Sequence, residues 1–175
     1  KIENLNFDDL GYKIIGNIPY YITSNLLRTI FESAGWRMAR PELIVLTIQK
    51  EVAQRIVAKP PKMNLLAVSV QFFSEPKIIS YISKENFRPR PKVDSAIIKL
   101  RTIGKLPLKD IAAFFKLVRA GFSQKRKQLK NNLQVIFGSQ TVQTIIKAGI
   151  SPESRAEELT VSDWIRITQN PIIKE

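Results

Sequence analysis

The apolar positions in the first third of the chain follow the pattern of strands alternating with helices. Residues 12–15 and 42–48 are apolar runs rich in β-branched side chains, which is typical of buried strands. Between them, apolar residues recur at helical spacing over 25–32, after a serine that can cap a helix. A second helix is predicted over 50–58, where two prolines stop it. This alternation favours a mostly parallel sheet covered by helices.

Three later runs, 65–73, 77–83 and 95–101, are also predicted to be strands, with a Pro-rich loop at 87–93. No helical pattern separates them, so we expect antiparallel pairing. Beyond residue 107 the apolar positions follow the helical period instead. On one helical wheel, which Gly121 can interrupt, a single face carries Ile111, Phe114, Phe115, Val118, Phe122, Leu129, Leu133 and Ile136. We therefore predict a partial α/β domain over 1–104 and a small helical domain over 105–175.

The chain is strongly basic, with 28 Lys and Arg against 15 Asp and Glu and a formal net charge of +13. Between residues 107 and 137 there are seven basic residues and one acid. A polyanionic partner is the natural inference, although a solvated basic face is the alternative. The sector beside the apolar face carries Lys116, Arg119, Ser123, Arg126, Lys127 and Lys130, and Lys125 is a further predicted RNA contact. We predict that this sector docks on RNA phosphates.

The 175 residues include no His and no Cys. Imidazole and thiolate catalysis, disulfides and the common zinc sites are thereby excluded. The longest apolar runs are too short to span a bilayer. We expect a cytoplasmic protein that uses neither a metal nor a membrane.

Candidate chemistry lies in Asn17, Ile18, Pro19 and Tyr20, directly after the first predicted strand. Ligands of open α/β sheets bind at the carboxyl ends of the strands. There the Asn17 side-chain oxygen and the Ile18 carbonyl can each accept a hydrogen bond from one N–H group of an exocyclic amine. The Tyr20 ring can stack on the same base. When both N–H groups are held out of the plane of the base, the amine nitrogen becomes pyramidal and its lone pair can attack a methyl sulfonium. The predicted role of Asn17 is therefore to orient the amine. The alternative is an ordinary turn between a strand and a helix.

The glycine pattern that cradles a nucleotide cofactor is missing. The seven glycines never stand two apart, so the chain contains no Gly-x-Gly, and it begins without Met. We expect a piece of a longer protein that holds the target-base side of the site and lacks most of the cofactor side. A natural chain without activity is the alternative.

Together these motifs resemble the ribosomal RNA adenine N6-dimethyltransferases of the small-subunit (KsgA) type. The matching stretches are 16–24, 49–52 with Arg55, 87–95, 122–127 and 149–159. The resemblance implies an α/β fold: the C-terminal portion of a Rossmann-like S-adenosylmethionine-dependent methyltransferase sheet, followed by a small all-helical domain that contacts RNA. It also implies the reaction, which is dimethylation of two adjacent adenosines near the 3′ end of small-subunit rRNA, and a full-length protein that is a monomer.

Roles carried over by this resemblance place the target N6 on Asn17 and the Ile18 carbonyl, with Tyr20 and Phe87 stacking on opposite faces of the flipped base. Asn17 is the one cofactor-binding residue retained. In the Pro-rich loop, Arg88, Arg90 and Lys92 are candidate phosphate contacts. Three residues are expected to have structural roles. Asp94 would hold this loop through hydrogen bonds from backbone amides, Glu51 would begin a helix, and Trp164 would pack in a core. Two alternatives stay open: a large-subunit methyltransferase of the macrolide-resistance type, and a non-catalytic RNA-binding or ribosome-assembly factor.

Overall fold

The computed structural model describes residues 12–19, 22–23, 26–27, 30, 41–103, 108 and 110–169. The predicted helix at 25–32 lies mostly outside these residues, as does Tyr20. The chain divides into two compact units, the first formed by Lys1–Val57 with Phe73–Gly104 and the second by Ala58–Phe72 with Lys105–Glu175. This division differs from the predicted domains in one segment, Ala58–Phe72, which groups with the helical unit. Each unit is described by itself.

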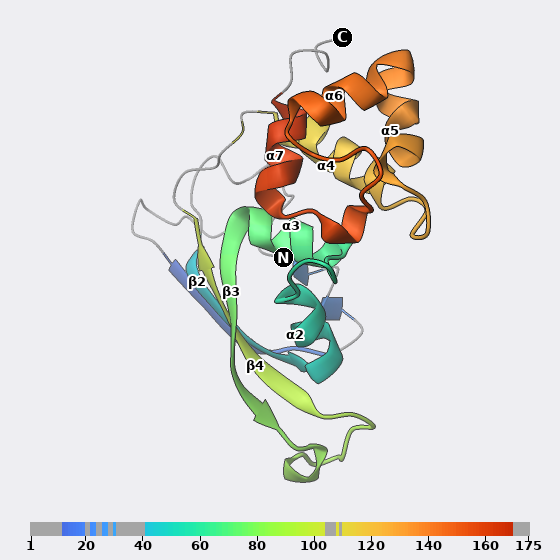
Figure 1. Ribbon diagram of the computed structural model, residues 1–175. Coiled ribbons are helices and arrows are strands. Elements are labelled where there is room, and N and C mark those ends of the chain that lie inside the picture. Colours follow the sequence, from blue (N-terminus) through green and yellow to red (C-terminus); the bar gives the residue numbers. More distant parts are fainter. Residues whose placement is uncertain are drawn as a thin grey trace. The chain divides into compact units, whose positions relative to one another are not determined.

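The first unit is built on a four-stranded sheet with the strand order β1-β2-β4-β3 among the described residues (Figure 1). Strands β1 (Tyr12–Asn17) and β2 (Pro41–Gln49) are parallel. Strand β4 (Ser95–Thr102) is antiparallel both to β2 and to β3 (Ser74–Ile82). The predicted strands at 42–48, 77–83 and 95–101 and the antiparallel pairing of the later ones are thus confirmed.

One face of the two central strands forms the core of this unit. Six apolar side chains on β2 and β4 have at most 1% of their surface exposed. They stand directly opposite one another in the register, Ile44 with Leu100, Leu46 with Ile98 and Ile48 with Ala96. Helix α2 (Lys50–Ile56) begins immediately after β2, contacts β2, β3 and β4, and buries Ala53 and Ile56. The hydrophobic effect therefore holds β2, β4 and α2 together at the point where β2 ends.

The prediction of a strand at 65–73 is wrong, because this segment is helix α3 (Leu65–Phe73). A short, mostly apolar run such as this one fits a buried helix as well as a buried strand. Asn64 decides between them by capping the helix. Its side-chain Oδ1 accepts a hydrogen bond from the Ala67 amide at 3.0 Å, and its carbonyl accepts one from the Val68 amide at 3.0 Å.

The second unit contains four further helices among its described residues, α4 (Ile111–Gly121), α5 (Leu129–Phe137), α6 (Thr141–Lys147) and α7 (Val161–Thr168). The Phe72 ring from α3 stacks on Phe114 with centroids 4.2 Å apart, and Trp164 is fully buried, as expected for a packing residue. None of the described helices has the length and apolar content needed to cross a membrane.

The single apolar face predicted over 111–136 is divided between two helices. Helix α4 ends at Gly121, α5 begins at Leu129, and residues 122–128 form the turn between them. Gly121 lies against the Trp164 ring: a Cβ atom at this position would stand 2.2 Å from Trp164 Cη2. Packing of the indole on the backbone therefore requires glycine at the end of α4.

Replacing Gly121 with Ala should lower the free energy of unfolding by about 1 to 3 kcal/mol, the usual cost of overpacking a core. Without the indole, Ala would be favoured over Gly in a helix by up to about 1 kcal/mol. In a Trp164→Leu background the same change should therefore be neutral or stabilising. Urea denaturation of the four proteins measures this reversal of sign, and an equal loss in both backgrounds would contradict it.

Candidate functional site

The Asn-Ile-Pro segment lies at the carboxyl end of β1, as predicted. Asn17 is the last residue of β1, is paired with Thr47 of β2 and is exposed. Ile18 and Pro19 follow, and the Pro19 carbonyl accepts a hydrogen bond from the Ile22 amide at 3.2 Å. Among the predicted residues of this segment, Tyr20 lies outside the described residues. Asn17 therefore presents its side chain at the edge of the sheet where ligands of this fold class bind.

The register of the sheet brings two distant segments to this same edge. Gln49, the last residue of β2, is opposite Ser95, the first residue of β4. Because β4 is antiparallel to β2, the segment that precedes β4 lies beside the start of α2, two positions beyond the pair Asn17–Thr47. The Pro-rich loop predicted at 87–93 thus lies at the edge that carries Asn17.

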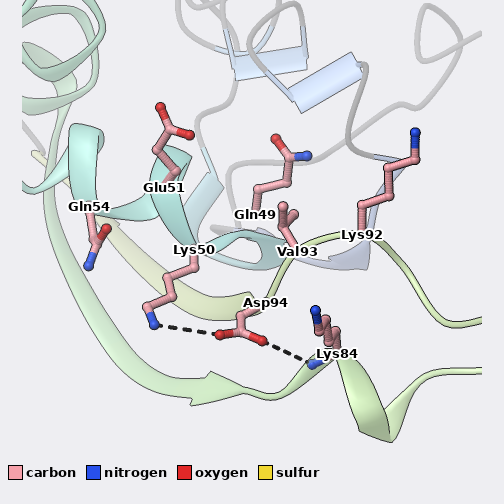
Figure 2. A pocket seen from close by; sticks show the side chains of 8 residues that line it. All are labelled: Gln49, Lys50, Glu51, Gln54, Lys84, Lys92, Val93 and Asp94. Atoms are coloured by element: carbon pink, nitrogen blue, oxygen red, sulfur yellow. Dashed lines mark hydrogen bonds and ion pairs between the residues drawn. The ribbon is translucent and has the colours of Figure 1, made fainter.

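Asp94 joins this loop to α2 (Figure 2). Its Oδ1 accepts a hydrogen bond from the Lys84 amide at 3.2 Å, and its Oδ2 lies 3.6 Å from Lys50 Nζ. Its carbonyl accepts a hydrogen bond from the Lys50 amide at 3.0 Å. The expectation that Asp94 holds the loop through a backbone amide is confirmed. The hydrogen bond from the Lys84 amide, followed by the attraction of Lys50, keeps the pKa of Asp94 below its ordinary value of 3.8.

Within the loop, two of the three predicted phosphate contacts bind the loop itself. Arg88 Nη1 donates to the carbonyls of Glu85 and Phe87, each at 3.1 Å. Arg90 forms an ion pair with the Glu85 carboxylate. Phe87 is half-buried directly after the 3₁₀ turn η3 (Lys84–Asn86), whereas Lys92 is exposed. Their assignment to RNA and to the target base remains a prediction.

A cleft of about 420 Å³ opens between the loop and α2. Of its lining residues, only Lys92 was predicted from the sequence to bind a ligand. The carboxyl end of a predicted strand was a usable signal for the polar residues 49–51, but nothing in the sequence indicated Lys84. The lining residues are Gln49, Lys50, Glu51, Gln54, Lys84, Lys92, Val93 and Asp94 (Figure 2).

In the second unit, the predicted basic residues are exposed on α4 and on the turn after it, with one on α5. Lys116 and Arg119 are exposed on α4, and Lys130 Nζ on α5 lies 3.9 Å from Glu153 Oε1. Residues 125–127, the Lys-Arg-Lys sequence that we call the basic turn, are all exposed between α4 and α5. The buried Asn132 amide donates to the carbonyl of Gly121 at 2.7 Å and of Gln124 at 3.1 Å. The basic turn is therefore held by backbone contacts that leave its charges free to face a ligand.

A family model for ribosomal RNA adenine dimethylase matches residues 3–171. The chain belongs to this family. Among its curated relatives is a ribosomal RNA small subunit methyltransferase A from Dehalococcoides mccartyi, 41% identical over 172 residues, which covers 93% of this chain and 58% of the relative. A protein of the same name from Lactiplantibacillus plantarum is 41% identical over 169 residues and covers 89% and 55%. This chain thus spans somewhat more than half the length of these relatives.

Solved structures confirm the Rossmann-like α/β fold of this chain. A dimethyladenosine transferase from Plasmodium falciparum matches it with a TM-score of 0.76 at 22% identity, over 94% of this chain and 67% of that one. The 23S rRNA methyltransferase ErmE matches with a TM-score of 0.71 at 21% identity, over 97% and 68%. At these identities the likeness establishes the fold alone. The described residues contain no group of three acidic side chains that could hold a metal ion.

The lowered pKa of Asp94 predicts an acid-dependent contribution to stability. A carboxyl whose folded pKa is depressed stabilises the fold above its unfolded pKa, and this contribution is lost as pH falls through the folded value. The difference in unfolding free energy between the unaltered protein and Asp94→Asn should therefore shrink between about pH 5 and pH 2. Urea denaturation across this range measures it, and a difference that does not change with pH would contradict the contribution of charge.

Because the Lys84 amide is the largest cause of the shift, Lys50→Met should raise the pKa of Asp94 only part of the way to 3.8. A carbon-detected NMR titration of the carboxyl group measures this value. Full recovery of 3.8 would show that the ion pair, and not the backbone hydrogen bond, dominates.

Proposed function

We propose that this chain forms the target-adenosine side of an S-adenosylmethionine-dependent adenine N6,N6-dimethyltransferase that acts on small-subunit rRNA. One observation carries the proposal: Asn17 is exposed at the carboxyl end of β1, on the sheet edge that also carries the Pro-rich loop. The family model and the small-subunit name of the curated relatives support the same substrate class.

The chain's own residues bind and orient the amine. The Asn17 side-chain oxygen and the Ile18 carbonyl accept hydrogen bonds from the two N–H groups of adenine N6. These hydrogen bonds direct the nitrogen lone pair out of the ring plane. S-adenosylmethionine supplies the methyl sulfonium when it is bound, and Asn17 is the described residue that we place beside it. After the first transfer one N–H bond remains, so the base must rotate about its C6–N6 bond before the second.

Stacking offsets the cost of removing the target base from its helix. A base between Tyr20 and Phe87 gains roughly 1 to 3 kcal/mol for each stacking contact, against an extrusion cost of a few kcal/mol. Phe87 is suited to this role because it is half-buried in a loop that Asp94 holds at the same sheet edge. The basic turn in the second unit supplies affinity for RNA phosphates that is independent of base identity.

The fold likeness to ErmE is compatible with the large-subunit alternative. It does not distinguish the two classes, because both solved neighbours share the fold of this chain. The 41% identity to two relatives with the small-subunit name favours the latter. A non-catalytic factor would have no use for Asn17 at the sheet edge.

In the full-length protein, Asn17→Ala should lower methyl transfer about 100- to 1,000-fold, as does the loss of one positioned transition-state partner in other enzymes. RNA affinity should stay almost unchanged, since phosphates supply most of it. Tritiated methyl transfer to unmethylated small ribosomal subunits, with nucleoside analysis of the product, measures the first quantity. Gln143→Ala, at an exposed amide on α6, is the control. Equal turnover by the Asn17 and Gln143 variants would remove the assigned role.

Reversing two charges of the basic turn, with Arg126→Glu and Lys127→Glu, should weaken RNA binding and reduce the slope of log affinity against log salt by about 1 to 2. The matched control is Lys59→Glu with Lys62→Glu, which changes the net charge equally at two exposed residues outside the turn. Fluorescence anisotropy with an rRNA fragment at several salt concentrations measures both slopes. If the two variants change the slope equally, general charge and not docking explains the binding.

A further inference from the structure

The cleft between α2 and the Pro-rich loop contains charged groups that form no ion pair within the described residues. Of its three lysines, Lys50 is paired with Asp94 and also lies 5.3 Å from the centre of the Tyr81 ring. Within the described part of the chain, neither Lys84 nor Lys92 forms an ion pair, and neither does the Glu51 carboxylate. Lys84 favours the ionised form of Asp94 only at longer range.

These groups line the same cleft. In Figure 2 the side chains of Lys84 and Lys92 stand on the loop side of the cleft, and Glu51 and Gln54 stand on the α2 side. The volume of about 420 Å³ lies within the roughly 300 to 1,000 Å³ of small-molecule sites. Gln49, at the end of β2, adds an amide that can both donate and accept.

The cleft lies at the sheet edge where we place the target adenosine. Gln49 is two positions beyond Thr47, which is the partner of Asn17 in the parallel pair. Successive residues of a strand are about 3.3 Å apart, so two positions span about 7 Å, which is the rise of about two nucleotides at roughly 3.4 Å for each phosphate of one strand. A strand of RNA whose adenine reaches Asn17 can therefore place a phosphate that lies within about two nucleotides of this adenine in the cleft.

We propose that this cleft is a binding subsite for an RNA nucleotide beside the target adenosine, with its phosphodiester held by the ammonium groups of Lys84 and Lys92. This inference rests on the proposed function. Glu51 offsets the charge of one of the two lysines, so the unpaired groups leave one net positive charge. The site therefore matches a phosphate that carries a single negative charge. A phosphodiester within an RNA chain carries one negative charge, whereas a free nucleotide monophosphate carries up to two and is repelled by Glu51.

The test measures coupling between the two lysines and one phosphate. A short fluorescent RNA containing the candidate adenosines is prepared with one linkage at a time replaced by an uncharged methylphosphonate. Its affinity for the full-length protein is measured by anisotropy. For one linkage the replacement should weaken binding about tenfold, the typical loss for a hydrogen bond to a charged group.

In Lys84→Gln with Lys92→Gln, the same replacement should have no further effect. Lys59→Gln with Lys62→Gln, which removes two exposed lysines outside the cleft, should retain the full tenfold loss. If every linkage weakens binding by the same factor in the cleft variant and in the unaltered protein, the lysines do not hold a phosphate and the proposal is overturned.

A second variant is expected to strengthen binding, and misfolding could not produce this effect. Glu51→Gln should tighten the RNA complex and should raise the affinity for adenosine 5′-monophosphate even more, since the repulsion of a second charge is removed. Binding of this mononucleotide to the unaltered protein without any methylphosphonate effect would identify a free-nucleotide site and overturn the RNA assignment.

None of these measurements needs turnover, so the subsite and the proposed reaction fail separately. Loss of coupling with normal methyl transfer would remove the subsite alone. Retained coupling together with full activity of Asn17→Ala would remove the catalytic assignment and leave an RNA subsite.

Discussion

The antiparallel register between β2 and β4 is the constraint on which the candidate site depends. It sets Gln49 opposite Ser95, so that the end of one strand and the beginning of another meet at the edge that carries Asn17. A slip of one residue would turn the buried side chains of a strand to the other face. The buried apolar pairs of these two strands therefore hold the register and, through it, the positions of residues that have no packing role.

Asp94 extends this constraint from the sheet to the loop. Its side chain and its carbonyl bind the two ends of the polar edge, Lys84 on one side and Lys50 on the other. The side chains of Lys50 and Asp94 are about two-fifths exposed, so solvent weakens their ion pair and the backbone hydrogen bonds are the more dependable restraint. Phe87 and Lys92 are thus presented on a loop that is closed at its base, which limits the entropy lost when RNA binds.

The second unit positions its charges by the same means. Trp164 packs on Gly121 where α4 ends, and the buried Asn132 amide binds the carbonyls of the turn that follows. The lysines and arginine of the basic turn make none of these contacts. In both units, a side chain hydrogen-bonded to backbone groups holds a charged segment, the Asp94 carboxylate in the first and the Asn132 amide in the second. Lys92 and the basic turn stay exposed on these segments, which suits a polyanion because these cations need not be desolvated to maintain the fold.

By itself the sequence determined the features that local physics encodes. The β-branched runs at 42–48, 77–83 and 95–101 indicated strands, the Asn17 segment followed a strand end, and its combination with the Pro-rich and basic stretches indicated the family. Local pattern failed at 65–73, where a short, mostly apolar run has no clear period and the Asn64 cap stabilises a helix. Over 111–136 the sequence placed the apolar positions on helices and Gly121 at a break, but only the structure showed that this glycine packs against the Trp164 indole. Only the tertiary structure decided that Lys84 and Glu51 line one cleft. These residues are more than thirty positions apart in the sequence, and the register of β2 and β4 brings their segments together. Strand register depends on packing between distant segments, which no local pattern records.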